Sequence, residues 1–200
     1  MEGIEKVNQE DKLKVFEKEL DYIINPKVKE FTEKAIQSLP DYFFSVPASS
    51  TGKYHPTYAL GEGGLVRHVR AVIRIAVQLY NLEMFNHFTE YEKDLMLSAL
   101  FLHDGAKSGI PQSNFTVAEH PTIVADYILN NPELNTILPI EDMELLLGGI
   151  RTHMGQWNLN FQKQEVLPKP RTKFQNFIHL ADYLGSRKML EMNFDVEVNR

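Results

Sequence analysis

The sequence contains no cysteine, and this excludes disulfide bonds, thiolate zinc sites and a cysteine nucleophile. Any bound metal ion must therefore take nitrogen and oxygen ligands. Basic residues are fewer than acidic ones: the sequence has 21 lysines and arginines and 27 aspartates and glutamates, so its formal charge is −6. This balance disfavours extended binding to a nucleic-acid backbone. Small anionic substrates are therefore more suitable partners than long nucleic acid.

Long apolar runs and strand-like alternation are both scarce. No apolar run reaches the roughly 18 residues that a membrane-spanning helix needs. The segment MEGIEKVNQEDKLKVFEKEL, residues 1–20, is charged throughout, so we expect no membrane interaction and a cytoplasmic location. Apolar and polar residues alternate, as they would in a strand, only in the short segment FDVEV, residues 194–198.

Helical periodicity, in contrast, runs through most of the chain. Apolar spacing and helix-stopping residues predict helices at 11–24, 26–39, 65–80, 90–104, 117–130, 141–154 and 172–188. The chain between residues 39 and 64 lacks a sustained period, and an irregular segment of this length is usually functional. We predict an all-α helical bundle and a single domain over residues 1–200, with an N-terminal helical extension at about 1–40 and a core at about 54–188.

Ionisable residues interrupt the apolar faces of these predicted helices. The segment LSALFLHDGAKSG, residues 97–109, ends a hydrophobic helix with adjacent His103 and Asp104, and burying a carboxylate is costly unless a partner compensates it. A single inward histidine is more often a core residue than a ligand. Six such residues from five predicted helices are better explained by a metal centre: His68, His103, Asp104, His120, His153 and Asp182.

The order of these six residues resembles that of the metal-dependent HD-domain phosphohydrolase superfamily, over roughly residues 54–188. The resemblance implies an HD-domain helical bundle with two divalent ions. It assigns His68, His103, Asp104 and Asp182 to one ion and Asp104, His120 and His153 to the other, so that Asp104 bridges both. YHPTYALGEGGLVRHV, residues 54–69, is similar to the segment before the first ligand in a family of 3′-to-5′ exoribonucleases.

The resemblance also implies a chemistry. Imidazole and carboxylate ligands suit Mn, Fe, Co, Ni or Zn, and paired ions suit hydrolysis at phosphorus. The expected substrate is a small, nucleotide-like phosphomonoester or phosphodiester. HDGAK is similar to the family's HD-x-G-K form with Gly105 and Ala106 in reverse order, and it places Lys107 beside a phosphate oxygen as a catalytic residue together with Asp104.

Further residues are candidates for contacts around that centre. Lys53, His55 and Arg151 are candidate substrate-binding residues, with solvated surface groups as the alternative. His179, one turn before Asp182, is a candidate for orienting a metal ligand, or else a core histidine. Tyr54, Tyr58 and Trp157 are candidates for stacking on a base, although single aromatics are more often packing residues.

Two other functions are compatible with the same residues. Some HD-fold proteins with a histidine-rich di-iron site are oxygenases that oxidise a small polyol or phosphonate, and the identity of the metal separates them from hydrolases. A nucleotide-binding regulatory module with a degenerate site is the alternative that is not an enzyme. The complete set of candidate ligands argues against that module.

Overall fold

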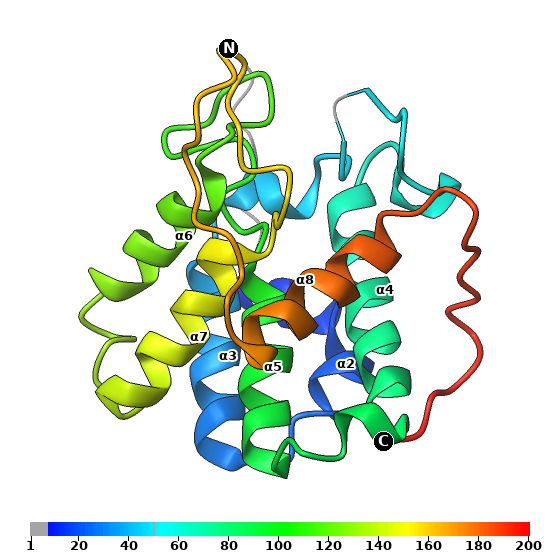
Figure 1. Ribbon diagram of the computed structural model, residues 1–200, viewed down its shortest axis with the longest axis vertical. Helices are drawn as coiled ribbons and strands as arrows, with labels where there is room; N and C mark the ends of the chain where they lie inside the picture. Colours follow the sequence, from blue (N-terminus) through cyan, green and yellow to red (C-terminus); the bar gives the residue numbers. More distant parts are fainter. Residues whose placement is uncertain (1–7, 50) are drawn as a thin grey trace.

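The computed structural model describes residues 8–49 and 51–200, and this part of the chain is helical without a β-sheet (Figure 1). The longer helices are α3 (Pro26–Ser38), α4 (Gly64–Leu79), α5 (Glu90–Leu102), α6 (His120–Leu129), α7 (Ile140–Thr152) and α8 (Lys173–Gly185). Shorter ones are α1 (Gln9–Lys14), α2 (Glu17–Leu20) and the 3-10 turns η1 (Asp41–Phe44), η2 (Thr57–Ala59) and η3 (Glu83–Phe85). The all-α prediction is confirmed.

The helices predicted from residue 26 onward agree with the structure to within a few residues at each end. Local signals explain this agreement, because Asn25 caps α3 ahead of Pro26, and capping boxes at Thr89 and Thr172 begin α5 and α8. Two predictions extend beyond the described residues. The N-terminal extension at about 1–40 includes residues 1–7, the irregular segment at 39–64 includes residue 50, and both parts lie outside the described ranges.

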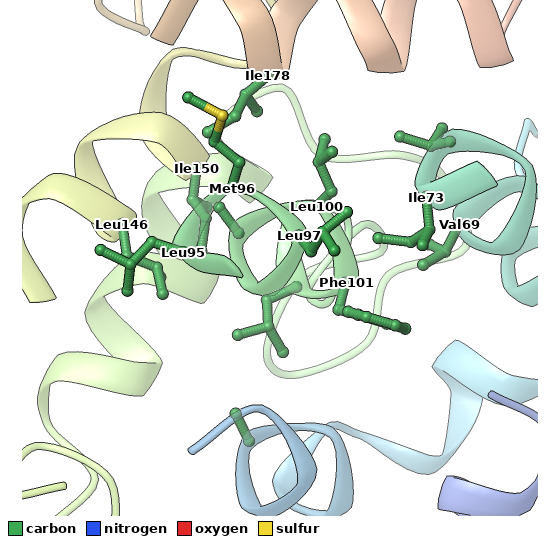
Figure 2. Close-up of a cluster of buried hydrophobic side chains, with 14 of the residues drawn as sticks. Val69, Ile73, Leu95, Met96, Leu97, Leu100, Phe101, Leu146, Ile150 and Ile178 are labelled. Atoms are coloured by element: carbon green, nitrogen blue, oxygen red, sulfur yellow. The ribbon is translucent and has the colours of Figure 1, made fainter. Parts of the chain in front are cut away.

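Helix α5 forms the centre of the bundle and packs against α3, α4, α7 and α8. Its residues from Leu95 to Leu102 are all buried, as expected for a helical segment whose residues are apolar or small on every side. Figure 2 shows their side chains between those of α4 and those of α7 and α8. Each fully buried leucine or phenylalanine stabilises the fold by about 1.5–3 kcal/mol. Because the residues from Leu95 to Leu102 are buried, the C-terminal end of α5 lies inside the molecule.

The single N-terminal helix predicted at 11–24 is wrong, because the chain breaks into α1 and α2 around Phe16. The break brings the fully buried Phe16 ring into edge contact with Phe101, at 5.5 Å between ring centroids. Chain direction also changes after α2, where the Asp94 carboxylate accepts hydrogen bonds from the backbone N–H groups of Ile24 and Asn25. Tertiary contacts thus override the helical period here.

The candidate strand FDVEV does not form, because residues 194–198 are turns, a bend and irregular coil. This C-terminal tail runs beside α4, where the Arg74 guanidinium donates a hydrogen bond to the carbonyl of Val196 (Figure 1). Phe194 lies against the guanidinium groups of Arg70 and Arg74, at 4.9 and 5.5 Å from its ring centroid. Side-chain contacts hold the tail instead of a strand ladder.

The structure also bears on the expected relation to membranes. Within the described residues, no helix combines the length and the apolar character that crossing a membrane requires.

Candidate metal centre

The ends of several helices bring the predicted ligands together. Helix α4 carries His68 in its first half, and His103 and Asp104 directly follow α5. His120 is the first residue of α6, His153 directly follows α7, and Asp182 lies in the last turn of α8. The structure thus gathers all six predicted ligands from segments far apart in the sequence: His68, His103, Asp104, His120, His153 and Asp182.

One group of possible ligands consists of His68, His103 and Asp182, whose donor atoms all lie within 4.8 Å of one another. The Asp182 Oδ1 atom is 3.0 Å from His68 Nε2 and 3.4 Å from His103 Nε2. Both histidine side chains are fully buried, and the Asp182 side chain is 16% exposed. Such a set of two imidazoles and one carboxylate suits a divalent transition metal.

A second group consists of His103, Asp104 and His153, which meet the same 4.8 Å spacing. His120 adjoins it, because His120 Nε2 is 2.9 Å from Asp104 Oδ1 and 3.3 Å from His153 Nε2. The other Asp104 oxygen, Oδ2, faces the first group, at 3.5 Å from His103 Nε2 and 3.8 Å from His68 Nε2. The two carboxylate oxygens therefore face different histidines, and His103 belongs to both groups.

Hydrogen bonds to backbone carbonyls orient three of the imidazoles. The Nδ1 atoms of His103, His120 and His153 lie 2.6–2.8 Å from the carbonyl oxygen three residues earlier, so each Nδ1 carries the proton. Their Nε2 atoms then face the cluster, where each can bind a metal once that nitrogen carries no proton. His103 and His153 follow the last turns of α5 and α7, where carbonyl groups lack partners within the helix. The accepting carbonyls belong to Leu100, Val117 and Ile150.

Several buried atoms of this cluster lack hydrogen bonds to the described residues. They include Nε2 of His103 and Oδ1 of Asp104. Buried polar atoms are almost always satisfied in folded proteins, so these atoms point to a bound species such as a metal ion. The donors and their spacing fit a divalent cation held by nitrogen and oxygen.

Burial and neighbouring charges shift the pKa values of several residues in this cluster. Burial raises the pKa of Asp104, but Lys107 and the neighbouring histidines lower it more, so that the net pKa lies well below its usual range. The pKa of Asp182 likewise lies well below its usual range, because His103 and His68 outweigh the effect of burial. Burial and the nearby His103 lower the pKa of His153 to about 3. These directions favour ionised carboxylates and a neutral His153, which are the forms that bind metal. Burial lowers the pKa of His103, but Asp104 and Asp182 raise it more, so its net pKa lies above its usual value.

A cavity of about 420 Å³ lies beside this cluster. His153 and Asp182 form part of its wall, together with two further predicted site residues, His55 and Lys107. The Lys107 ammonium forms an ion pair with Asp104 Oδ2 at 2.5 Å. Lys107 thus contacts a predicted ligand at the edge of the space that a substrate would occupy.

The structure does not bring the other two predicted substrate-binding residues to this cavity wall. Lys53 is exposed, with its ammonium 5.2 Å from the centre of the Tyr54 ring. Arg151 forms an ion pair with Asp126 on the adjacent helix α6, at 2.9 Å. Of the aromatic candidates, Tyr54 and Trp157 line the cavity, whereas the hydroxyl group of Tyr58 donates to the carbonyl of Gly185.

His179 acts on the cluster through the backbone. Its Nδ1 atom is 2.7 Å from the carbonyl oxygen of His153, so the imidazole holds the chain at the end of α7. Gly155, which has a φ of +59°, allows this approach, because a Cβ atom there would collide with the His179 ring. His179 is thus placed to position His153 without touching the cluster itself.

Sequence reasoning missed four residues of the cavity wall, namely Met154 and Ser186 and the stacked pair Tyr183 and Arg187. The Arg187 guanidinium lies 4.2 Å from the centre of the Tyr183 ring, and Tyr183 stacks on Trp157 with ring centroids 5.6 Å apart. Tyr183 and Arg187 follow Asp182 by one and five residues, but Arg151 lies equally near His153 without reaching the cavity, so nearness to a ligand in the sequence would not have identified them.

Comparisons of the chain with protein-family models, curated proteins and solved structures give no match. The observations that bear on function are therefore the helical fold and the buried histidine and aspartate cluster, whose groups could coordinate metal ions.

Proposed function

We propose that this chain is a metal-dependent phosphoric ester hydrolase of the HD-domain type, which acts on a nucleotide-like phosphoester. The observation that carries the proposal is the Asp104 carboxylate, whose two oxygens face different histidines of two overlapping groups of possible ligands. Such an arrangement suits two neighbouring divalent ions. The order of the six ligands along the chain, which resembles that of the HD superfamily, supports the same proposal.

The proposed ligands are His68, His103 and Asp182 on one side of Asp104, and His120 and His153 on the other. Bound divalent ions would supply Lewis-acid polarisation of a phosphoryl oxygen and acidify a water molecule. The chain supplies the orientation, because three imidazoles are held by backbone carbonyls and His153 is also held through His179.

Lys107 is the residue that we propose to bind the phosphoryl group of the substrate. Its ammonium lies against Asp104 and lines the cavity, so it can donate hydrogen bonds to a phosphoryl oxygen placed there. His55 lines the same cavity, and its Nδ1 atom lacks a hydrogen-bond partner among the described residues. We assign it to binding an ester oxygen of the substrate. A lysine in direct contact with the central carboxylate suits an anionic substrate such as a phosphoester, and the identity of the bound metal separates a hydrolase from an oxygenase.

The test combines metal analysis with a screen of phosphomonoesters and phosphodiesters in the presence of Mn²⁺. We expect bound divalent metal and metal-dependent hydrolysis in the unmodified protein, and loss of both in His103→Ala. His87→Ala is the matched control, because His87 is exposed and outside the cluster. A protein that binds iron and consumes dioxygen without cleaving any phosphoester would contradict the proposal, as would full hydrolysis by His103→Ala.

A further inference from the structure

The cavity of about 420 Å³ beside His153 and Asp182, which we term the aromatic cavity, has an arginine in its wall. The guanidinium carbon of Arg187 lies 4.2 Å from the centre of the Tyr183 ring and 5.7 Å from that of Trp157. The two rings are nearly parallel, at an interplanar angle of 10°. A guanidinium group is attracted to the face of an aromatic ring, so these rings hold Arg187 in place in the wall.

Hydrogen bonds at the end of α8 fix the orientation of Arg187. Its Nε atom donates to the carbonyl of Tyr183 at 3.1 Å, and its Nη2 atom donates to the Ser186 hydroxyl at 2.8 Å. The same hydroxyl group donates to the carbonyl of Tyr183, also at 2.8 Å. The guanidinium group is therefore oriented before any ligand binds, and a ligand that it contacts need not order a free side chain.

These bonds leave one edge of the guanidinium group unused. Within residues 8–49 and 51–200, Nη1 donates no hydrogen bond, and no carboxylate lies within 4.0 Å of Arg187. The remaining N–H groups belong to Nη1 and Nη2, and they form the planar fork that binds an oxyanion with two parallel hydrogen bonds. Lys107 differs in this respect, because its ammonium is already paired with Asp104.

Capping of α8 accounts for only part of this arrangement. Arginines near the end of a helix commonly bond to its last carbonyl groups, and the bond from Nε to Tyr183 has that role. It does not explain why the rest of the guanidinium group lies in a cavity wall without an anion. The charged groups of this wall are Lys107, Arg187 and Asp182, two positive and one negative, in a chain with a formal charge of −6. The wall thus favours an anionic ligand more than the chain as a whole does.

We infer that Arg187 forms a carboxylate-binding subsite in the aromatic cavity, and that the carboxylate belongs to a flat organic group that contacts Trp157. The Trp157 side chain is 44% exposed, so part of its ring is accessible to such a group. A carboxylate is planar, and both of its oxygens can accept from the fork. A tetrahedral phosphate would leave oxygens outside that plane. For the substrate, the inference rests on the proposed function: the phosphoester then carries a carboxylate at a distance from phosphorus.

A binding experiment tests the subsite without hydrolysis, in metal-free protein from which the chelator has also been removed. Trp157 is the one tryptophan of the chain, so its fluorescence reports on the aromatic cavity. Benzoate and the neutral benzamide have nearly the same shape. Benzoate should bind at least about fivefold more tightly, because hydrogen bonds to an ionised group are roughly twice as strong as those to a neutral one. Phenyl phosphate should bind no more tightly than benzoate.

Arg187→Gln should remove most of the preference for benzoate and leave the affinity for benzamide unchanged, which a purely structural role would not predict. Arg171→Gln is the matched control, because Arg171 is exposed and outside the cavity wall, and it should keep the preference. Equal affinities for benzoate and benzamide in the unmodified protein would overturn the inference, as would tighter binding of phenyl phosphate. A preference that survives in Arg187→Gln but is lost in Lys107→Ala would place the anion at Lys107 and overturn it too.

A kinetic measurement separates this inference from the proposed function. With Mn²⁺-loaded protein, kcat/KM for 4-carboxyphenyl phosphate should exceed that for 4-carbamoylphenyl phosphate at least about fivefold, and Arg187→Gln should make the two nearly equal. Hydrolysis of both esters with equal kcat/KM in the unmodified protein would overturn the inference while leaving a phosphoester hydrolase in place. Preferential benzoate binding that depends on Arg187, without hydrolysis of either ester, would support the subsite and overturn the proposed function.

Discussion

Replacing Asp104 with asparagine should nearly abolish the stabilisation of the protein by divalent metal. Asparagine has the same shape as aspartate but lacks the negative charge with which the carboxylate faces both groups of histidines. A ligand that binds only the folded state stabilises it by about 2.7 kcal/mol when its concentration is one hundred times Kd. For a chain of this size, each kcal/mol raises Tm by about 2–4 °C, so one bound ion should raise Tm by about 5–11 °C.

The metal-free state should also become less stable. Asp104 is buried and paired with Lys107, whose side chain is 13% exposed. Removing one partner of a buried ion pair typically costs about 3–5 kcal/mol. Because water reaches part of Lys107, we expect the lower end of that range, or a Tm decrease of about 6–12 °C.

Thermal unfolding followed by circular dichroism, with a chelator and then with excess Mn²⁺, measures both effects. Asp126→Asn is the matched control, because Asp126 is exposed and paired with Arg151 outside the cluster, and it should keep the full rise in Tm with metal. An Asp104→Asn protein with the same metal-dependent rise as the unmodified protein would refute the reasoning. A rise that is absent already in the unmodified protein would refute the metal centre itself.

Three further predictions follow from the same geometry. Lys107→Ala should lower kcat by about 10²–10³ while metal content, measured by elemental analysis, stays unchanged, and an active variant would show that the ammonium has no role in turnover. His153→Ala should reduce bound Mn²⁺ from two ions to one at saturation, and an unchanged ratio would exclude this residue as a ligand. Gly155→Ala should destabilise the protein by about 1–3 kcal/mol in urea titration, because its Cβ would collide with the His179 ring, and an unchanged midpoint would contradict that packing.

The sequence by itself determined the helices from residue 26 onward and the candidate ligands. Both depend on local information, because a position on the apolar stripe of a helix follows from residues within two turns. His68 and His120 lie on such stripes, and His103 and Asp104 follow the most thoroughly buried helix, α5. A polar residue on a buried stripe must point inward wherever the helix packs, so a buried position could be expected from spacing, whereas the meeting of these residues in one cluster depends on how the helices pack.

Only the tertiary structure decided which residues surround that cluster. Arg151 turns to Asp126 on a neighbouring helix, whereas Arg187 lies over Tyr183 beside the cavity, and nothing in their local sequence distinguishes the two arginines. Long, partly exposed side chains take their direction from partners that are distant in sequence. The break at Phe16 has the same origin, since the Phe101 ring that it meets lies in α5, and the helical period of the N-terminal segment contains no trace of that contact.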